Sequence, residues 1–168
     1  KPHLFLSKWV VRPLAKIATN YRTSRGDVNY DIPLVRAEFT ETDILVDPSL
    51  LGLLLGDGGL KSTSLGFSTV DGFILGELRR LVPAPCVVKH LGRCDYSITS
   101  PESRNILKTQ LREYGLLVAG SEKKHIPDQY LLNTTRNRIA LLQGLMDTDG
   151  TVSNKSSLSY CTTSPELA

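Results

Sequence analysis

The stretch LLGLLLGDGGL, residues 50–60, decides the fold of this chain. It has the composition of a buried helix, yet it carries its only charge, Asp57, at the carboxyl end, directly before two glycines. A negative charge is unfavourable at that end, because the free carbonyl groups of the last turn already form the negative end of the helix dipole. The chain repeats this arrangement in LLQGLMDTDGTV, residues 141–152, where Asp149 and Gly150 follow a second apolar run.

The two acid-tipped segments predict two copies of one small unit. Asp57 and Asp149 are 92 residues apart, and two short extended pieces follow each of them. A period of this length is too long for a solenoid repeat and favours a duplicated α/β unit. We therefore expect an α/β (α+β) fold with a leading segment over residues 1–46, a first unit over 47–133 and the start of a second unit over 134–168. The second copy contains only a helix and two strands, so four of its expected elements are missing.

Local signals predict where the elements begin and end. Asp47-Pro48 predicts the start of the first helix, because Asp caps free amide groups and Pro suits the first helical position. Gly58 predicts a left-handed cap at its end. The sequence then predicts extended pieces at 59–61 and 65–69, a helix over 71–82, a hairpin over 86–99 that turns near Gly92, and a helix that Ser100-Pro101 opens and Gly115 ends. The second copy is expected to hold a helix over 133–150, capped by Thr134 or Thr135, and strands at 151–153 and 158–163. The leading segment is expected to hold a strand and a helix over 8–21, a loop over 22–29 and a strand over 30–35.

Small residues on the two apolar helices predict that they pack side by side. Gly52 and Gly56 are four positions apart, as are Gly144 and Thr148. Small side chains at this spacing let two helix backbones approach closely. Parallel packing would bring the two terminal acids together at one end. Since oxygen ligands favour a hard divalent ion, we expect Mg²⁺ between them, where it would assist phosphodiester hydrolysis.

Composition sets broad limits on function. The net charge is +3, and residues 79–125 contain nine basic and four acidic side chains, which suits contact with phosphates but also describes an ordinary solvated face. Three cysteines without a CxxC spacing fit neither a disulfide framework nor a zinc site. With no visible signal peptide and no apolar run of the ~20 residues that span a bilayer, we expect an intracellular (cytoplasmic) protein that does not enter a membrane.

The two motifs resemble those of a known family. LLGLLLGDG (50–58) and LQGLMDTDG (142–150) resemble the paired nonapeptides of LAGLIDADG homing endonucleases of the DOD type, with departures from the consensus at Leu55 and Gly56. The order of elements over 48–114 is similar to the αββαββα unit of that family, whose complete members of this kind are monomeric pseudo-dimers. The resemblance implies metal-binding catalytic roles for Asp57 and Asp149 and a structural or solvated role for Asp147. It further implies a catalytic role for Lys124, which stands before Ile126-Pro127 in KKHIPDQYL.

The leading segment resembles the part of an intein that connects the splicing domain to the endonuclease, although the nucleophilic first residue and terminal His-Asn of splicing are absent. The resemblance as a whole implies a site-specific endonuclease that cuts both strands of double-stranded DNA with a divalent metal. By position in the strands, Lys61, Lys89, Arg93 and Lys155 are candidate DNA contacts. Two alternatives stay open: a non-cleaving nucleic-acid binder, such as a regulator or an intron maturase, and a degenerate intein remnant. Because its second unit is incomplete, we expect the 168-residue chain by itself to be inactive on specific DNA.

Overall fold

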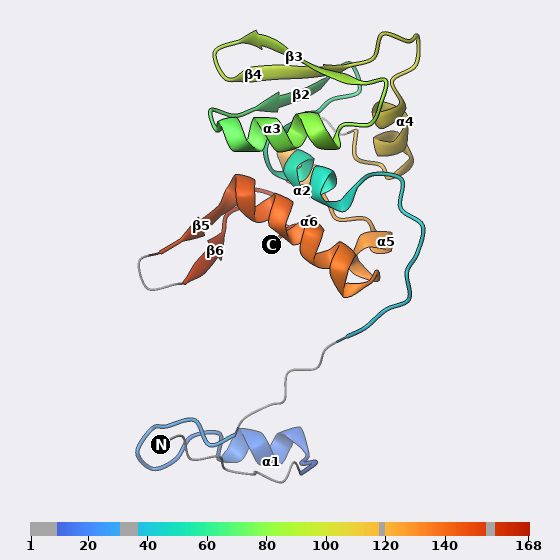
Figure 1. Ribbon diagram of the computed structural model, residues 1–168. Coiled ribbons are helices and arrows are strands. Elements are labelled where there is room, and N and C mark those ends of the chain that lie inside the picture. The colour runs from blue at the N-terminus through green and yellow to red at the C-terminus, as the bar shows by residue number, and fades with distance from the viewer. Residues whose placement is uncertain (1–9, 31–36, 118–119, 154–156) are drawn as a thin grey trace, which may run out of the picture. The chain divides into compact units, whose positions relative to one another are not determined.

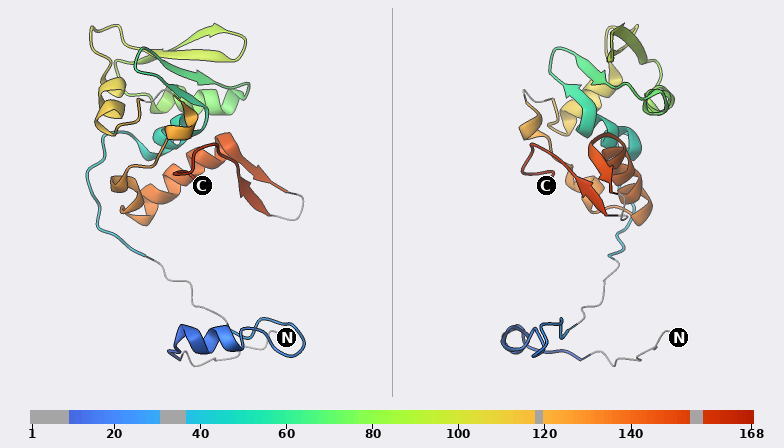
Figure 2. Two further views of the ribbon diagram at one scale, coloured as in Figure 1. Left: turned by 180° about the vertical axis from the view of Figure 1, so that it is seen from behind. Right: turned by 90° about the vertical axis from the view of Figure 1, so that its left-hand side faces the viewer.

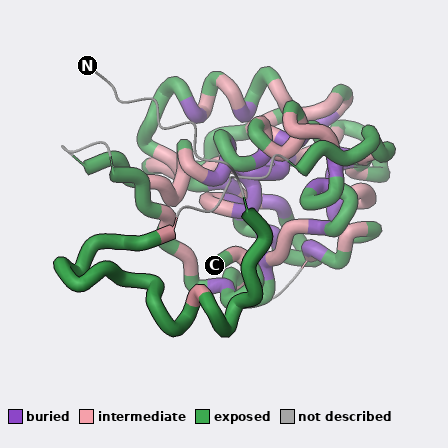
Figure 3. The backbone as a smooth tube through the Cα atoms, turned by 90° about the horizontal axis from the view of Figure 1, so that it is seen from below, coloured by how far each residue is buried: buried purple, intermediate pink, exposed green. Residues whose placement is uncertain are grey.

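The computed structural model describes residues 10–30, 37–117, 120–153 and 157–168, and the chain divides into two compact units, 1–36 and 37–168, which are treated separately. The described part of the first unit holds helix α1 (Leu14–Thr19) and a turn closed by a bridge between Arg22 and Val28. None of its side chains is buried, and it shows no purple in Figure 3. The helix expected within 8–21 is confirmed. Residues 10–13 form no strand, and the strand expected over 30–35 falls almost wholly outside the described residues.

Helix α2 (Pro48–Asp57) opens the second unit where the sequence predicts it. Asp47 Oδ1 accepts hydrogen bonds from the Ser49 and Leu50 N–H groups at 2.9 and 3.1 Å, and Pro48 takes the first helical position. The predicted left-handed cap at Gly58 is wrong, because Gly58 has extended angles of φ −76° and ψ 134°. The chain passes from the helix directly into strand β1 (Gly58–Leu60), so Gly58 begins a strand instead of closing a turn.

One antiparallel sheet belongs to the first copy of the repeat, which lies within the second compact unit. Its strands β1, β2 (Leu65–Ser68), β4 (Asp95–Thr99) and β3 (Val87–Gly92) lie side by side in that order. The hairpin between β3 and β4 turns at Gly92 and Arg93, which both have positive φ, so the turn expected near Gly92 is confirmed. Helices α2, α3 (Gly72–Leu81) and α4 (Ile106–Glu113) pack their buried leucines against one face of this sheet (Figure 1).

Helix α4 begins later than predicted. Its first residue is Ile106 and its cap is Asn105, whereas residues 101–104 form bends. The Asn105 side chain accepts from the Lys108 N–H at 2.9 Å and donates to the Ile98 carbonyl at 3.1 Å, which ties the start of the helix to strand β4. This link to strand β4 outweighs the local helix-start signal of Ser100-Pro101. Gly115, with φ +70°, ends the helix as expected.

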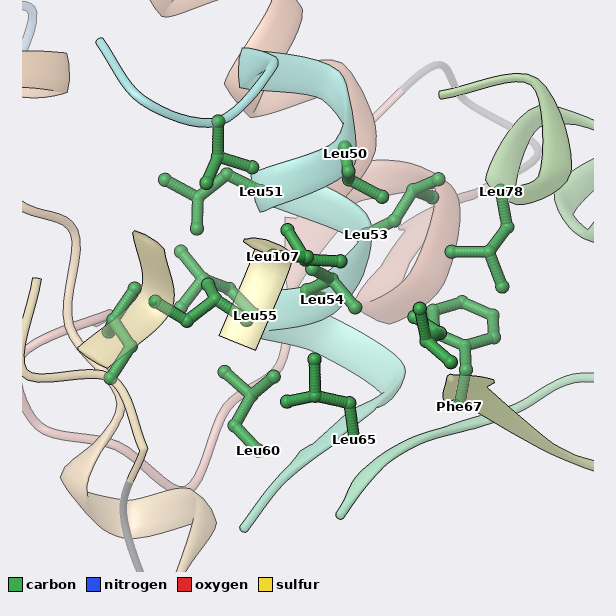
Figure 4. Close-up of a cluster of buried hydrophobic side chains, with 14 of the residues drawn as sticks. Leu50, Leu51, Leu53, Leu54, Leu55, Leu60, Leu65, Phe67, Leu78 and Leu107 are labelled. Atoms are coloured by element: carbon green, nitrogen blue, oxygen red, sulfur yellow. The ribbon is translucent and has the colours of Figure 1, made fainter. Parts of the chain in front are cut away.

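The core forms around α2, whose leucines are almost entirely buried (Figure 4). Leu51 and Leu54 expose none of their surface, and they pack with Phe67 of the sheet and with Leu78 and Leu107 of the covering helices. Burying a leucine side chain contributes roughly 1.5–3 kcal/mol, so this cluster is the main source of stability in the unit. The remaining buried apolar residues of α2 are Leu50, Leu53 and Leu55.

The last part of the chain repeats the first helix and the first two strands. Helix α6 (Thr135–Asp149) is capped by Thr134 and passes directly into the hairpin of β5 (Gly150–Val152) and β6 (Leu158–Tyr160). Gly58 pairs with Phe67 in the first hairpin, and Gly150 pairs with Tyr160 in the second. In both copies the glycine that follows the helix pairs with an aromatic residue of the second strand, which supports the internal repeat, and the mixture of helices and antiparallel strands confirms the α+β fold. The short helices η1 (Ser121–Lys123) and α5 (Asp128–Leu131) precede α6 (Figure 2).

Among the described residues, no helix has both the length and the apolar composition required to cross a bilayer.

Candidate functional site

Helices α2 and α6 touch backbone to backbone, and this contact builds the site. A Cβ added at Gly52 would lie 2.9 Å from Gly144 Cα, and a Cβ added at Gly144 would lie 2.8 Å from Leu53 N. Four residues further along, a Cβ at Gly56 would lie 2.6 Å from Thr148 Cβ. The contact therefore advances in the same direction along both helices, as expected from the spacing of the small residues.

Parallel packing brings Asp57 and Asp149 close enough to interact. Both side chains are half-buried at the ends of their helices. Burial raises the pKa of Asp57 above its ordinary value, and the negative charge of Asp149 raises it further. The positive charge of Lys124 acts in the opposite direction and lowers the pKa of Asp57. The site thus holds two carboxylates and one ammonium group that interact electrostatically.

Lys124 offsets the unfavourable position of an acid at the carboxyl end of an apolar helix. Its side chain is only 4% exposed, and its Nζ donates to the carbonyl oxygens of Leu55 and Gly56 at 2.9 and 2.8 Å and more weakly to Leu54 at 3.5 Å. These carbonyls form the negative end of α2, so the ammonium group offsets the helix dipole as well as the nearby acids. Burial lowers the pKa of Lys124, whereas Asp149 and Asp57 raise it.

The segment that carries Lys124 is fixed from several directions. Its main-chain N–H donates to the Ser121 carbonyl at 3.2 Å, which closes helix η1. Its carbonyl accepts a 2.5 Å hydrogen bond from Ser164 Oγ, and Ser164 is 1% exposed. Sequence reasoning missed Ser164, because a serine forty residues away from its partner belongs to no local pattern.

A cavity of about 250 Å³ opens beside these groups. Cys161 and Thr162, which follow strand β6, contribute to its wall together with Lys124 and Asp149. The Cys161 N–H donates to the Asp149 carbonyl at 3.2 Å, so the hairpin of the second copy is tied to the end of its helix. Burial raises the pKa of the neighbouring Tyr160, and the Asp149 charge acts in the same direction. The other lining residues are Leu55, Gly56, Ser121 and Thr163.

The donor set fits a hard divalent cation with few protein ligands. The described residues contain no group of three or more His, Cys, Asp or Glu side chains arranged to hold a metal, so Asp57 and Asp149 stand as a pair. Mg²⁺ commonly binds through one or two carboxylates and keeps several water molecules. Burial is the main cause of the raised pKa of Asp57, and the charge of Asp149 adds to it. Asp147 is exposed, in keeping with the solvated role expected for it.

The residues chosen as DNA contacts do not all lie in strands. Lys89 is an exposed residue of β3, whereas Lys61 follows the end of β1 and Arg93 occupies the turn after β3, so their assignment to strands was wrong. Lys155 lies outside the described residues. Lys89 pairs with Ser97, and Ser97 pairs with Gly66, so these three residues lie side by side on one face of the sheet. This is the outer face, opposite the core, and these residues are small or polar. Lys89 therefore stands beside small residues on the outer face of the sheet.

Comparisons with known proteins give one informative similarity. No family model matches the chain. It is 30% identical over 161 residues to a replicative DNA helicase DnaB of Mycobacterium intracellulare. The alignment covers 94% of this chain but 24% of the helicase sequence, so the chain spans about a quarter of the length of the relative that it matches.

Proposed function

We propose that this chain is part of a LAGLIDADG homing endonuclease that hydrolyses both strands of DNA with the help of a divalent metal. The observation that carries the proposal is the joint position of Asp57, Asp149 and Lys124 at the ends of two parallel, closely packed helices. Paired acids at buried helix ends reduce stability, since each faces the negative end of a dipole. If the acids bind a metal ion, this function explains why both copies have an acid at a position where it reduces stability.

The similarity to a helicase supports an intein setting for the proposal. An intein is translated inside its host protein, so its sequence is found as an internal segment of a longer chain that bears the host's name. A match that covers 24% of a DnaB helicase fits in length a segment of this kind. The residues also contain no GxxxxGK[ST] sequence, the phosphate-binding loop of P-loop ATPases. ATP-driven unwinding therefore has no support within this chain, and an inserted endonuclease accounts better for the paired acids.

Each residue of the site has a distinct proposed role. A bound Mg²⁺ would supply a polarised water and stabilise charge that develops on the phosphate. Asp57 and Asp149 would hold the metal through carboxylate oxygens. The Nζ of Lys124 faces three carbonyl oxygens, which can use all three of its N–H donors. In this arrangement Lys124 acts through its positive charge, which draws the phosphate towards the acid pair, and it donates no hydrogen bond to the phosphate because its donors are used by the carbonyls.

The sheet supplies the proposed binding surface for DNA. Its outer face places Gly66 and Ser97 beside the exposed Lys89. A two-stranded or wider β-ribbon fits the major groove of B-DNA, and phosphate contacts by Lys and Arg dominate the affinity. Lys61 and Arg93, at the ends of β1 and β3, would contact the backbone from the rims of this face.

Cleavage can be tested on genomic DNA, which offers every candidate target sequence at once. The full polypeptide that contains this chain is incubated with genomic DNA in Mg²⁺, and new double-strand ends are mapped by sequencing. We expect ends at one or a few sites, lost in EDTA and in Asp149→Asn and Asp57→Asn, but kept in the control Asp147→Asn. Binding of the recovered site in EDTA should change less than threefold in the two inactive variants. If specific binding occurs without any cleavage, the non-cleaving binder is the correct function; cleavage that survives in both variants would remove the catalytic assignment.

A further inference from the structure

Positive charge is divided unevenly between the two units of the chain. Residues 1–36 contain seven Lys and Arg side chains and two acids, a net charge of +5. Residues 37–168 contain thirteen basic and fifteen acidic side chains, a net charge of −2. The net positive charge of the protein therefore comes from the leading unit, whereas the unit that carries the acid pair has a slightly negative balance.

The described part of the leading unit presents its basic residues on an ordered scaffold. Asn29 N–H donates to the Tyr21 carbonyl at 2.9 Å, and Thr23 N–H donates to the Asp27 carbonyl at 2.9 Å, which closes a short antiparallel turn. Gly26, with φ +88°, provides the left-handed residue of this turn. Arg25, next to it, stands at the tip. Asn29 Nδ2 also donates to the Asn20 carbonyl at 2.9 Å, which joins the turn to the end of α1.

These basic residues are exposed and have no acidic partners. Among the residues that the structure describes, the one ion pair joins Glu77 and Arg80 in the second unit. The Arg22 guanidinium lies 5.6 Å from the centre of the Tyr21 ring, and Tyr21 is 57% exposed. The basic side chains in this part are Arg12, Lys16, Arg22 and Arg25, and all are exposed.

We infer that the leading unit is a second DNA-binding module, which adds non-specific phosphate affinity to the contacts made by the second unit. We call Arg12, Lys16, Arg22 and Arg25 the leading basic set. The inference relies on the proposed function only for the choice of double-stranded DNA as partner. Two modules on one chain bind the same duplex more tightly than either alone, because the first contact raises the local concentration of the second. The leading unit would thus hold the enzyme on DNA while the second unit reads sequence.

Salt dependence of binding tests this inference separately from cleavage. Binding of the full chain to a 30-base-pair duplex of arbitrary sequence is measured in EDTA by fluorescence anisotropy between 50 and 200 mM NaCl. Each phosphate contact contributes about 0.9 to the slope of log affinity against log salt, so replacing the leading basic set by alanine should lower the slope by about 3 to 4. Over this fourfold range of salt, the wild-type affinity should fall roughly 100-fold more than that of the variant.

A charge-matched control separates this site from a general effect of charge. Lys123, Arg79, Arg112 and Arg136 are four exposed basic residues of the second unit. Their replacement by alanine removes the same charge and should change the slope by less than 1. Since all eight replaced residues are exposed, the far-ultraviolet circular dichroism of both variants should match the wild type. An unchanged slope in the leading-set variant, an equal loss in the control, or wild-type binding too weak to measure at 50 mM would each overturn the inference.

Discussion

Replacing Asp57 by asparagine should make the metal-free chain more stable and abolish its response to Mg²⁺. Asp57 is half-buried at the negative end of α2, and burial together with the Asp149 charge raises its pKa above the ordinary value of 3.8. A carboxylate at a helix C-terminus costs about 0.3–1 kcal/mol. Asparagine keeps the shape and removes the charge. Allowing for the partial exposure of the site, we expect a gain of about 1 kcal/mol in EDTA, or an increase in Tm of roughly 2–5 °C.

The sign of the pH dependence follows from the raised pKa. Because folded Asp57 binds its proton more tightly than unfolded Asp57, the wild type loses stability as pH rises through the folded pKa. The advantage of Asp57→Asn should therefore be full at pH 7, decline as pH falls through the raised pKa of Asp57, and vanish below 3.8. Thermal unfolding followed by circular dichroism at a series of pH values measures this difference.

Magnesium should reverse the order of stability. If the acid pair binds Mg²⁺ with a Kd of about 1 mM, 10 mM Mg²⁺ stabilises the wild type by ~1.4 kcal/mol and leaves Asp57→Asn almost unchanged. Asp147→Asn is the matched control, since Asp147 is an exposed acid in the last turn of α6. It should keep the response to Mg²⁺. A wild type that Mg²⁺ does not stabilise, or an Asp57→Asn variant that is less stable in EDTA, would refute the reasoning.

Three further substitutions test the architecture of the site by urea unfolding. Lys124→Met should cost about 2–3 kcal/mol, because it leaves buried carbonyls of α2 without a charged donor, whereas Met at the exposed Lys123 should change stability by less than about 0.5 kcal/mol; equal effects would contradict the capping role. Gly144→Ala should cost about 1–3 kcal/mol by forcing α2 and α6 apart, whereas Gly76→Ala, where an added Cβ meets nothing, should gain roughly 0.5–1 kcal/mol; a neutral Gly144→Ala would mean that the helix contact is loose. Ser164→Ala should cost about 1–3 kcal/mol by leaving the Lys124 carbonyl unpaired, and an unchanged midpoint would show that this bond is dispensable.

The sequence alone determined the elements whose signals are local. Asp47-Pro48 specified the start of α2 through one capping carboxylate and one ring, and Gly115 specified the end of α4 through a positive φ. The duplication was also readable, because leucines, small residues and an acid recur with one period of 92 residues. The choice of Asp57 and Asp149 as a pair followed from this repeat and from the small residues between the helices.

Tertiary structure decided whatever depends on partners distant in the chain. The local sequence predicts a helix cap at Gly58, but pairing with Phe67 makes this glycine the first residue of a strand. Helix α4 begins at Ile106 after its cap Asn105, not at Ser100-Pro101, because the Asn105 side chain bonds to the Ile98 carbonyl of β4. These differences share one cause: strand pairing and side-chain bonds between elements outweigh the weaker preferences of single residues.

Lys124 shows most clearly what the sequence determines and what only the tertiary structure determines. Its place before Ile126-Pro127 made it a candidate site residue only through the resemblance to the LAGLIDADG family. Its burial and its bonds to the carbonyls of Leu55 and Gly56 were not readable, because those acceptors lie about seventy residues earlier and are exposed to it only where α2 ends. A pattern in the sequence can nominate a charged residue, but only folding determines which charges, dipoles and water it meets, and these set its pKa and its chemistry.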